Sequence, residues 1–244
     1  MSIDSVIAKN ASTPDWVICE DGPLLAVNKP AGIITEGHGD TVAASVKQFL
    51  KSKYQKDGNV YLGIPHRLDR DTTGAIVFTR NSKTAARVSQ QFRDRTVSKS
   101  YLVLLEQVPV PSQGVFEDWL IKDKERSFVE VSTREDEKSR EARLSYQTLH
   151  VEDGLALVQV ELHTGRTHQI RVQFASRGFP VLGDLKYGGT EWQPHGVEPA
   201  ANPTRFVALH SVSLQLKHPI RYDDLIITAP LPSCWPAWTR SFLD

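Results

Sequence analysis

Short apolar stretches that alternate with polar residues, or run without interruption, predict several β-strands. Residues 16–29 read as two strands around Asp21-Gly22, a dipeptide that favours a tight hairpin turn. The continuous apolar run AIVF at 75–78 is typical of a buried strand. Further strands are expected at 100–105, 143–149, 155–162, 210–216 and 225–230.

Three segments have the spacing of amphipathic helices. Residues 41–54 place apolar side chains at helical intervals, with Thr41 as a candidate cap, and residues 81–95 turn Val88 inward and basic residues outward. The third segment is ambiguous, because Ile170, Val172 and Phe174 alternate as in a strand. A glycine at 178 suits a helix end, so a helix starting near residue 167 is preferred.

Strands outnumber helices and mostly follow one another directly. This order predicts an α+β fold, with a largely antiparallel or mixed sheet flanked by helices, rather than a doubly wound fold. No linker divides the chain, so we expect one catalytic domain over residues 16–244 after a tail at 1–15. The Gly- and Pro-rich residues 187–204 are expected to form a long loop.

The balance of 29 basic and 29 acidic residues argues against a polyanion binder that works by total charge, but a local patch remains open. Residues 80–101 hold six basic residues against one acidic residue and are a candidate phosphate-binding surface. Residues 117–143 are acidic on balance and are expected to be a solvated surface. With two distant cysteines, no zinc pattern, no leader and no long apolar run, we expect a cytoplasmic monomer with free thiols and no membrane contact.

Charged clusters give the candidate chemistry. In HRLDRDTTG, at 66–74, Asp69 is either a turn residue or a carboxylate that neighbouring arginines keep ionised in a cleft. Tyr101 is either a packing residue or an aromatic platform for a base. In HTGRTHQIRVQFASRG, at 163–178, helical spacing brings His168 and Arg171 to a similar side, and no metal site is expected from His163 and His168.

Together, HRLDRDTTG, KSYLVLL, HTGRTHQIRVQFASRGFPVLGD and LAVNKPAG strongly resemble the pseudouridine synthases of the RluA-type branch, in the family's order and from about residue 16 to about residue 230. Thr73 stands where relatives usually carry serine. The small N-terminal RNA-binding domain of many relatives is not expected here.

The resemblance implies an enzyme that isomerises uridine in transfer or ribosomal RNA to pseudouridine without a cofactor or metal. It implies that Asp69 is the catalytic carboxylate, acting as nucleophile or base, that Tyr101 stacks on uracil, and that Arg171 pairs with Asp69. Asp71 is expected to be structural. The residues expected to bind the RNA or the substrate are Lys29, His66, Arg67, Arg166 and His168.

Two other classes of function are weighed against this one. A glycoside hydrolase also breaks a glycosidic bond, but Asp69 and Asp71 are poorly placed to flank a sugar from one segment. An RNA-binding protein without catalysis is disfavoured because Asp69, Tyr101 and Arg171 are all present.

Overall fold

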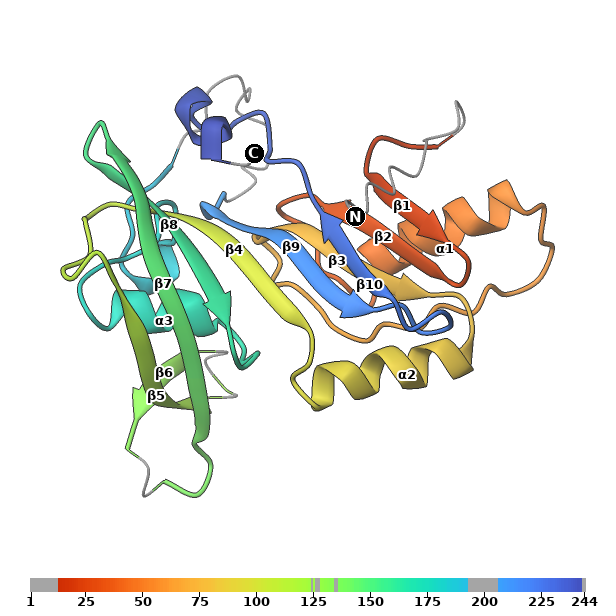
Figure 1. Ribbon diagram of the computed structural model, residues 1–244, viewed down its shortest axis with the longest axis horizontal. Helices are drawn as coiled ribbons and strands as arrows, with labels where there is room; N and C mark the ends of the chain where they lie inside the picture. The colour runs from red at the N-terminus through yellow and green to blue at the C-terminus, as the bar shows by residue number, and fades with distance from the viewer. Residues whose placement is uncertain (1–12, 124, 126–127, 134–135, 193–205, 243–244) are drawn as a thin grey trace.

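The computed structural model describes residues 13–123, 125, 128–133, 136–192 and 206–242, which form one mixed sheet of ten strands (Figure 1). The order along the sheet is β1-β2-β3-β9-β4-β8-β7-β5-β6, with β10 paired to β9. Of the strand pairs in these residues, β3 with β9 is parallel and the others are antiparallel. The strands are β1 (Val17–Asp21), β2 (Leu24–Lys29), β3 (Thr73–Thr79), β4 (Ser98–Leu105), β5 (Gln113–Asp123), β6 (Phe128–Ser132), β7 (Arg140–Glu152), β8 (Leu155–Leu162), β9 (Leu209–Lys217) and β10 (Asp224–Thr228).

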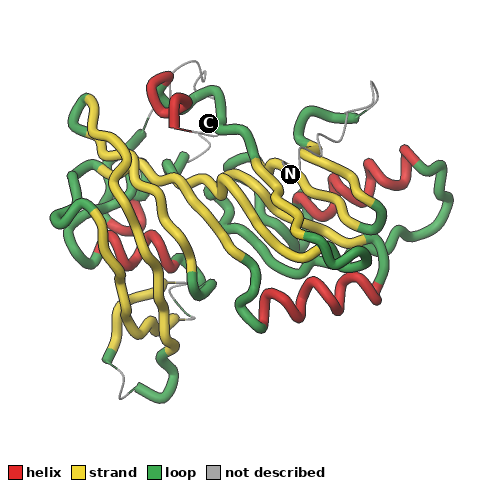
Figure 2. Tube along the Cα trace, viewed as in Figure 1, coloured by secondary structure: helices red, strands yellow, loops and turns green. Residues whose placement is uncertain are grey.

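The expected α+β class is confirmed, and the helices are few and short (Figure 2). The Thr41 side chain caps α1 by accepting from the Ala44 N–H at 3.0 Å, as the sequence predicts. The third helix is confirmed, and the strand-like alternation of its sequence has no counterpart in burial, because its polar residues are buried as well as its apolar ones. The helices are α1 (Val42–Lys53), α2 (Ser82–Arg93) and α3 (Gln169–Ala175), with 3-10 turns η1 (Leu185–Tyr187) and η2 (Ala237–Phe242).

The strands β2 and β3 are buried on both faces, which accounts for their continuous apolar sequences. Leu25 and Ile76 belong to the cluster that receives Val46 of α1. Alternate side chains of the same strands belong to the cluster that receives Val88 of α2. The helices α1 and α2 therefore cover opposite faces of this end of the sheet.

At the other end of the sheet, α3 packs against the long strands. The Phe174 ring makes edge contacts with Phe116 of β5 and Tyr146 of β7. The expected solvated surface over residues 117–143 is confirmed for most of its charged side chains, which are exposed, but parts of β5, β6 and β7 also lie in this stretch. Their inward side chains, such as Leu120 and Val129, are buried while acidic and basic residues alternate outward.

The expected loop 187–204 lies in part outside the described residues, as does most of the expected N-terminal tail. Cys19 is half-buried, Cys234 is buried, and both are free thiols. Among the helices of the described residues, none has the length and apolarity required to span a bilayer.

Candidate active site

Asp69 lies in the loop that leads into β3, on the wall of a pocket of about 500 Å³. Residues far apart in the sequence complete this pocket, including Tyr101 from β4 and Arg171 from α3. Five Lys or Arg residues and two carboxylates line it, so its charge is positive on balance. The volume falls within the range of roughly 300–1,000 Å³ that is usual for small-molecule sites.

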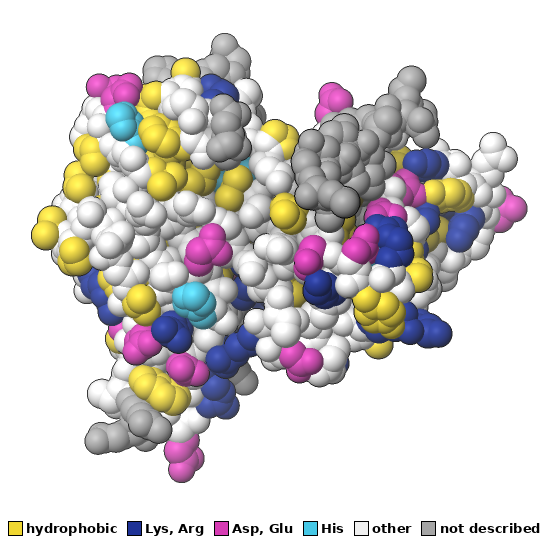
Figure 3. Space-filling view, viewed as in Figure 1, with side chains coloured by type: hydrophobic (Ala, Val, Ile, Leu, Met, Phe, Trp, Pro, Cys, Tyr) yellow, Lys and Arg dark blue, Asp and Glu magenta, His cyan; other side chains and the backbone are white. Residues whose placement is uncertain are grey.

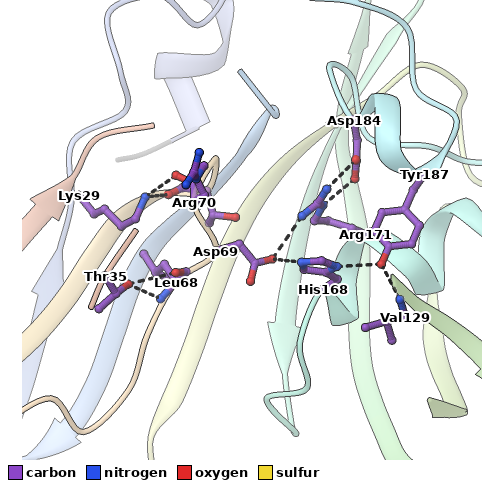
Figure 4. A network of polar contacts seen from close by, with 11 residues as sticks. Lys29, Thr35, Leu68, Asp69, Arg70, Val129, His168, Arg171, Asp184 and Tyr187 are labelled. Atoms are coloured by element: carbon purple, nitrogen blue, oxygen red, sulfur yellow. Dashed lines mark hydrogen bonds and ion pairs between the residues drawn. The ribbon is translucent and has the colours of Figure 1, made fainter. Parts of the chain in front are cut away.

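The loop that carries Asp69 is held on both sides of this residue. The Thr35 hydroxyl donates to the Leu68 carbonyl at 3.0 Å and accepts from the Leu68 N–H at 3.2 Å. The Lys29 ammonium donates to the carbonyls of Arg70 at 2.7 Å and Thr72 at 2.9 Å, and also to that of Pro30. The backbone around the carboxylate is therefore fixed before any substrate binds (Figure 4).

Gly74 allows the end of this loop to approach β9. Its φ is +112°, and a Cβ at this position would overlap the backbone of Ser211. Gly74 pairs with Ser211 in the parallel contact between β3 and β9, and Tyr101 of β4 pairs with the same residue from the other side. The glycine therefore helps to bring the Asp69 loop and Tyr101 to one pocket.

Arg171 is buried between two carboxylates. Its Nε and Nη2 each donate to Asp184 at 2.7 Å, and its Nη1 lies 3.5 Å from Oδ2 of Asp69. Burial alone would lower the pKa of Arg171, but the hydrogen bonds and charge of Asp184, with the charge of Asp69, raise it above its ordinary value. The guanidinium thus stays cationic beside Asp69, and the bidentate partner that holds it is Asp184.

His168 lies on the other side of Arg171 from Asp184, and reaches Asp69 as well (Figure 4). Its Nε2 is 3.9 Å from Oδ2 of Asp69 and its Nδ1 is 2.8 Å from the Tyr187 hydroxyl. Burial lowers the pKa of His168 to about 4, although the Asp69 charge opposes the shift. The imidazole is therefore neutral at pH 7.

Tyr101 presents its ring to the pocket and is otherwise buried, with 8% of its surface exposed. Burial raises the pKa of Tyr101 well above its ordinary value, and the negative charge of Asp69 raises it further. The side chain is thus a protonated phenol on a rigid strand, which can offer a flat apolar face and one hydroxyl.

Lys99 and Arg166 line the pocket, and Arg95 and Arg140 lie close enough to act on their charges. We call these four cations the basic rim. Burial lowers the pKa of Lys99 to about 8, and the positive charges of Arg95 and Arg166 lower it further. Burial also lowers the pKa of Arg166, and the positive charges of Arg95 and Arg140 lower it further. Figure 3 shows Lys and Arg side chains gathered between the lower end of β7 and the C-terminal end of α2.

The expectation of one basic surface over residues 80–101 needs correction, because the structure divides these residues. Arg80 forms an ion pair with Glu20 at 2.6 Å, and Arg87 donates to the Pro219 carbonyl at 2.6 Å. Arg95 and Lys99, at the other end of the stretch, belong to the basic rim. Arg80 precedes the 12-residue helix α2, Arg87 lies within it, and Arg95 and Lys99 follow it.

Two of the residues expected to bind RNA have other positions. Lys29 is fully buried, and its ammonium donates to three backbone carbonyls, so its expected contact with RNA is corrected to a role in holding the Asp69 loop. His66 lines the pocket, but its ring stacks on Phe92 and its Nε2 accepts from the Val77 N–H at 3.0 Å. Burial, with the charge of Lys99, lowers the pKa of His66 to about 3, so it adds no positive charge.

Arg67 and Arg166 lie on the pocket as expected, and Arg67 is exposed. Sequence reasoning missed the roles of Asp184, Tyr187 and Lys99. Asp184 ends the motif HTGRTHQIRVQFASRGFPVLGD, but its side chain was given no role there, and Tyr187 lies just beyond the motif. Lys99 had a visible signal because it stands two residues before Tyr101 on one strand. Within the described residues, no group of three or more His, Cys, Asp or Glu could hold a metal ion.

Comparisons with known proteins agree with this geometry. The family model described as RNA pseudouridylate synthase matches residues 23–176. An uncharacterized RNA pseudouridine synthase of Bacillus subtilis is 31% identical over 93% of this chain and 72% of its own length. The ribosomal large subunit pseudouridine synthase C of Rickettsia bellii is 29% identical over 93% of this chain and 71% of its own length.

The fold has a counterpart among solved structures. The human RNA pseudouridylate synthase domain containing 4 superimposes with a TM-score of 0.73 at 26% identity, covering 89% of this chain and 88% of that one. The sequence matches and the fold match therefore agree with the residues of the pocket. The chain belongs to the RNA pseudouridine synthases of the RluA-type branch, which are isomerases.

Proposed function

We propose that this enzyme converts specific uridines of ribosomal or transfer RNA to pseudouridine, with Asp69 as the catalytic carboxylate. The observation that carries the proposal is the position of Asp69 in the pocket, where Oδ2 lies 3.5 Å from a buried arginine and where the Tyr101 ring also faces the cavity. The names of the relatives, ribosomal large subunit pseudouridine synthases C and D, favour ribosomal RNA.

The reaction breaks the N1–C1′ bond of uridine and forms a C5–C1′ bond, and the proton lost from C5 is balanced by a proton gained at N1. The target base has to leave its stack before C1′ can be reached, and a pocket with an aromatic face and cationic walls favours the extruded nucleotide. Asp69 acts at the ribose as nucleophile or base. The positive charge of Arg171 keeps the Asp69 carboxylate ionised when the bound substrate excludes water from the site.

Tyr101 is proposed to stack on the uracil ring and to use its hydroxyl during loss of the C5 proton. The basic rim and Arg67 are proposed to bind the phosphates on either side of the extruded nucleotide. Phosphate contacts of this kind position an RNA without reading its sequence.

The direct test uses purified enzyme and transcripts of large-subunit ribosomal RNA and of transfer RNAs. Pseudouridine has the mass of uridine, so the product is detected by its reaction with carbodiimide. Modification of one or a few uridines is the expected result. Release of free uracil instead would favour a glycoside hydrolase, and binding without product would favour the non-catalytic protein.

Replacing Tyr101 by phenylalanine is expected to leave RNA affinity near that of the wild type and to slow product formation strongly. The substitution keeps the aromatic face, which is the part that stacks, and removes the hydroxyl. Binding is measured by filter retention and turnover by carbodiimide detection. Turnover equal to that of the wild type would limit Tyr101 to stacking, whereas weakened binding would point to a collapsed pocket.

RNA binding is expected to weaken as the pH rises from 7 to 9, because Lys99 loses its proton near pH 8. If Lys99 neutralises one phosphate, the slope of log affinity against log salt should change by about 0.7 over this range. Lys99→Met should have the smaller slope already at pH 7, and Lys99→Arg should keep the larger slope to pH 9.

Lys83→Met is the matched control, because Lys83 is an exposed cation of α2 and does not line the pocket. It should bind RNA as the wild type does at each pH. A Lys99→Met enzyme whose slope equals that of the wild type at pH 7 would remove Lys99 from the phosphate-binding groups.

A further inference from the structure

His168 enters α3 in a backbone conformation that residues with a Cβ rarely adopt. Its φ is 53° and its ψ is 21°, in the left-handed region. Such conformations persist where the surrounding structure holds them, often at functional sites. Here the conformation places the imidazole between the Asp69 carboxylate and the Tyr187 hydroxyl (Figure 4).

The contacts of Tyr187 determine which nitrogen of His168 carries the hydrogen. The Tyr187 oxygen accepts from the Val129 N–H of β6 at 3.1 Å. The phenol has one hydrogen of its own, and the described residues offer it no hydrogen-bond acceptor besides His168 Nδ1, at 2.8 Å. The phenol therefore donates to Nδ1, and the hydrogen of the neutral imidazole is on Nε2.

Two donors thus converge on one oxygen of Asp69. The Nε2–H of His168 approaches Oδ2 at 3.9 Å, and Nη1 of Arg171 approaches the same oxygen at 3.5 Å. Both distances exceed those of direct hydrogen bonds, and such contacts often tighten when substrate binds. The nearest contacts of both donors are with Oδ2, and within the described part of the chain no hydrogen bond reaches Oδ1, which is the oxygen left for the substrate.

The surroundings make His168 a neutral dipole rather than a charge. Asp69 faces it from the loop before β3, Arg171 from α3, and Asp184, Lys186 and Tyr187 from the segment around η1. Burial has the largest effect, and with the positive charges of Arg171 and Lys186 it outweighs the two carboxylates and lowers the pKa of His168 to about 4. The ring therefore keeps one hydrogen at neutral pH.

We propose that His168 is a positioning residue, whose Nε2–H tautomer is fixed by Tyr187 and which orients Asp69 so that Oδ1 faces the ribose. The inference rests on the proposed role of Asp69 in the reaction. It differs from the expectation that His168 binds RNA, and it predicts that losses fall on kcat rather than on RNA affinity.

The tautomer is measured first, on enzyme labelled with ¹⁵N-histidine, by long-range ¹H–¹⁵N correlation at pH 7, with His168→Gln to assign the signal. The wild type should show a protonated Nε2 and an unprotonated Nδ1 at His168. In Tyr187→Phe, which keeps the ring packed on Phe128, the donor to Nδ1 is gone, and the Nδ1–H form should appear. The turnover of this variant should fall by about tenfold or more, the scale seen when a partner that orients a metal-ligating histidine is removed.

Rescue separates positioning from simple packing. His168→Gln can place an amide N–H near the position of Nε2–H, whereas His168→Leu cannot, so kcat should decrease from wild type to His168→Gln to His168→Leu at nearly equal RNA affinity. His163→Gln is the matched control. His163 lies in the same segment, is exposed, contacts Ser145 and does not line the pocket, so this variant should behave as wild type.

An Nδ1–H or doubly protonated His168 in the wild type at pH 7 would overturn the inference. So would a His168→Leu enzyme that loses RNA affinity and keeps kcat, because His168 would then be an RNA contact. The tautomer is read without turnover. A wild-type enzyme that forms no pseudouridine would therefore contradict the proposed function, and the wrong tautomer would contradict this inference alone.

Discussion

Replacing Asp69 by asparagine is expected to lower turnover by about three orders of magnitude or more, the scale reached when a catalytic nucleophile or base is removed. Asparagine keeps the shape of the side chain but has neither the charge nor the basicity of the carboxylate. The fold should survive, because the loop is held by Lys29 and Thr35 through backbone atoms and the Asp69 side chain is 27% exposed.

Turnover is followed by release of tritium from RNA labelled at C5 of uridine, and folding by circular dichroism. Glu36→Gln is the matched control, since Glu36 is the other carboxylate that lines the pocket and is exposed. It should retain activity. An active Asp69→Asn enzyme would contradict the assignment of the carboxylate, and equal losses in both variants would support a mechanism with two carboxylates, as in glycoside hydrolases.

The second large effect is expected at the buried pair of Arg171 and Asp184. Arg171→Met leaves Asp184, which is 1% exposed, without its cation and should lower the free energy of unfolding by about 3–5 kcal/mol. Asp184→Asn leaves Arg171 with only its longer contact to Asp69. Arg171→Met should also abolish most turnover, because Asp69 loses its neighbouring cation. Asp184→Asn should also reduce turnover, because Asp184 holds the Arg171 guanidinium that contacts Asp69.

A double-mutant cycle from denaturant midpoints tests this pair. Arg171→Met with Asp184→Asn should be more stable than the sum of the two single losses predicts, because no buried charge is then left alone. The coupling of Arg171 with Asp69 should be smaller, since that contact is 3.5 Å long and partly exposed. Strictly additive losses at Arg171 and Asp184 would contradict the account of the buried pair.

The ion pair between Arg177 and Asp118 is the matched control for this cycle. It is also bidentate, at 2.9 and 3.0 Å, and Arg177 follows the same helix α3. Its arginine is 31% exposed and neither residue lines the pocket, so Arg177→Met should cost less stability and leave turnover unchanged.

The parts of this fold that depend on local pattern could be predicted from the sequence. The apolar run at 75–78 becomes the buried β3, Thr41 caps α1, and Gly178, with φ +82°, follows the end of α3. The strands within residues 117–143 could not be predicted from the charges, because strands with one exposed face can carry many charges on it. A count of charges hides that alternation.

The candidate site could be predicted only in its main residues. Asp69, Tyr101 and Arg171 carry the resemblance to the family, and the fold brings all three to one pocket. The pairing of Arg171 with Asp184 depends on how the chain after α3 folds back, and the burial of Lys29 depends on a loop 41 residues away. Such long-range contacts leave no periodic signal in the sequence.

The most direct test of the central claim is a map of pseudouridine in total RNA from cells that lack this gene and that carry either the wild-type gene or Asp69→Asn. Carbodiimide marks each pseudouridine, and primer extension locates it. We expect one or a few uridines of ribosomal or transfer RNA to be modified with the wild-type gene and unmodified with Asp69→Asn. A map that is the same with either gene, or the same with no gene, would contradict the central claim.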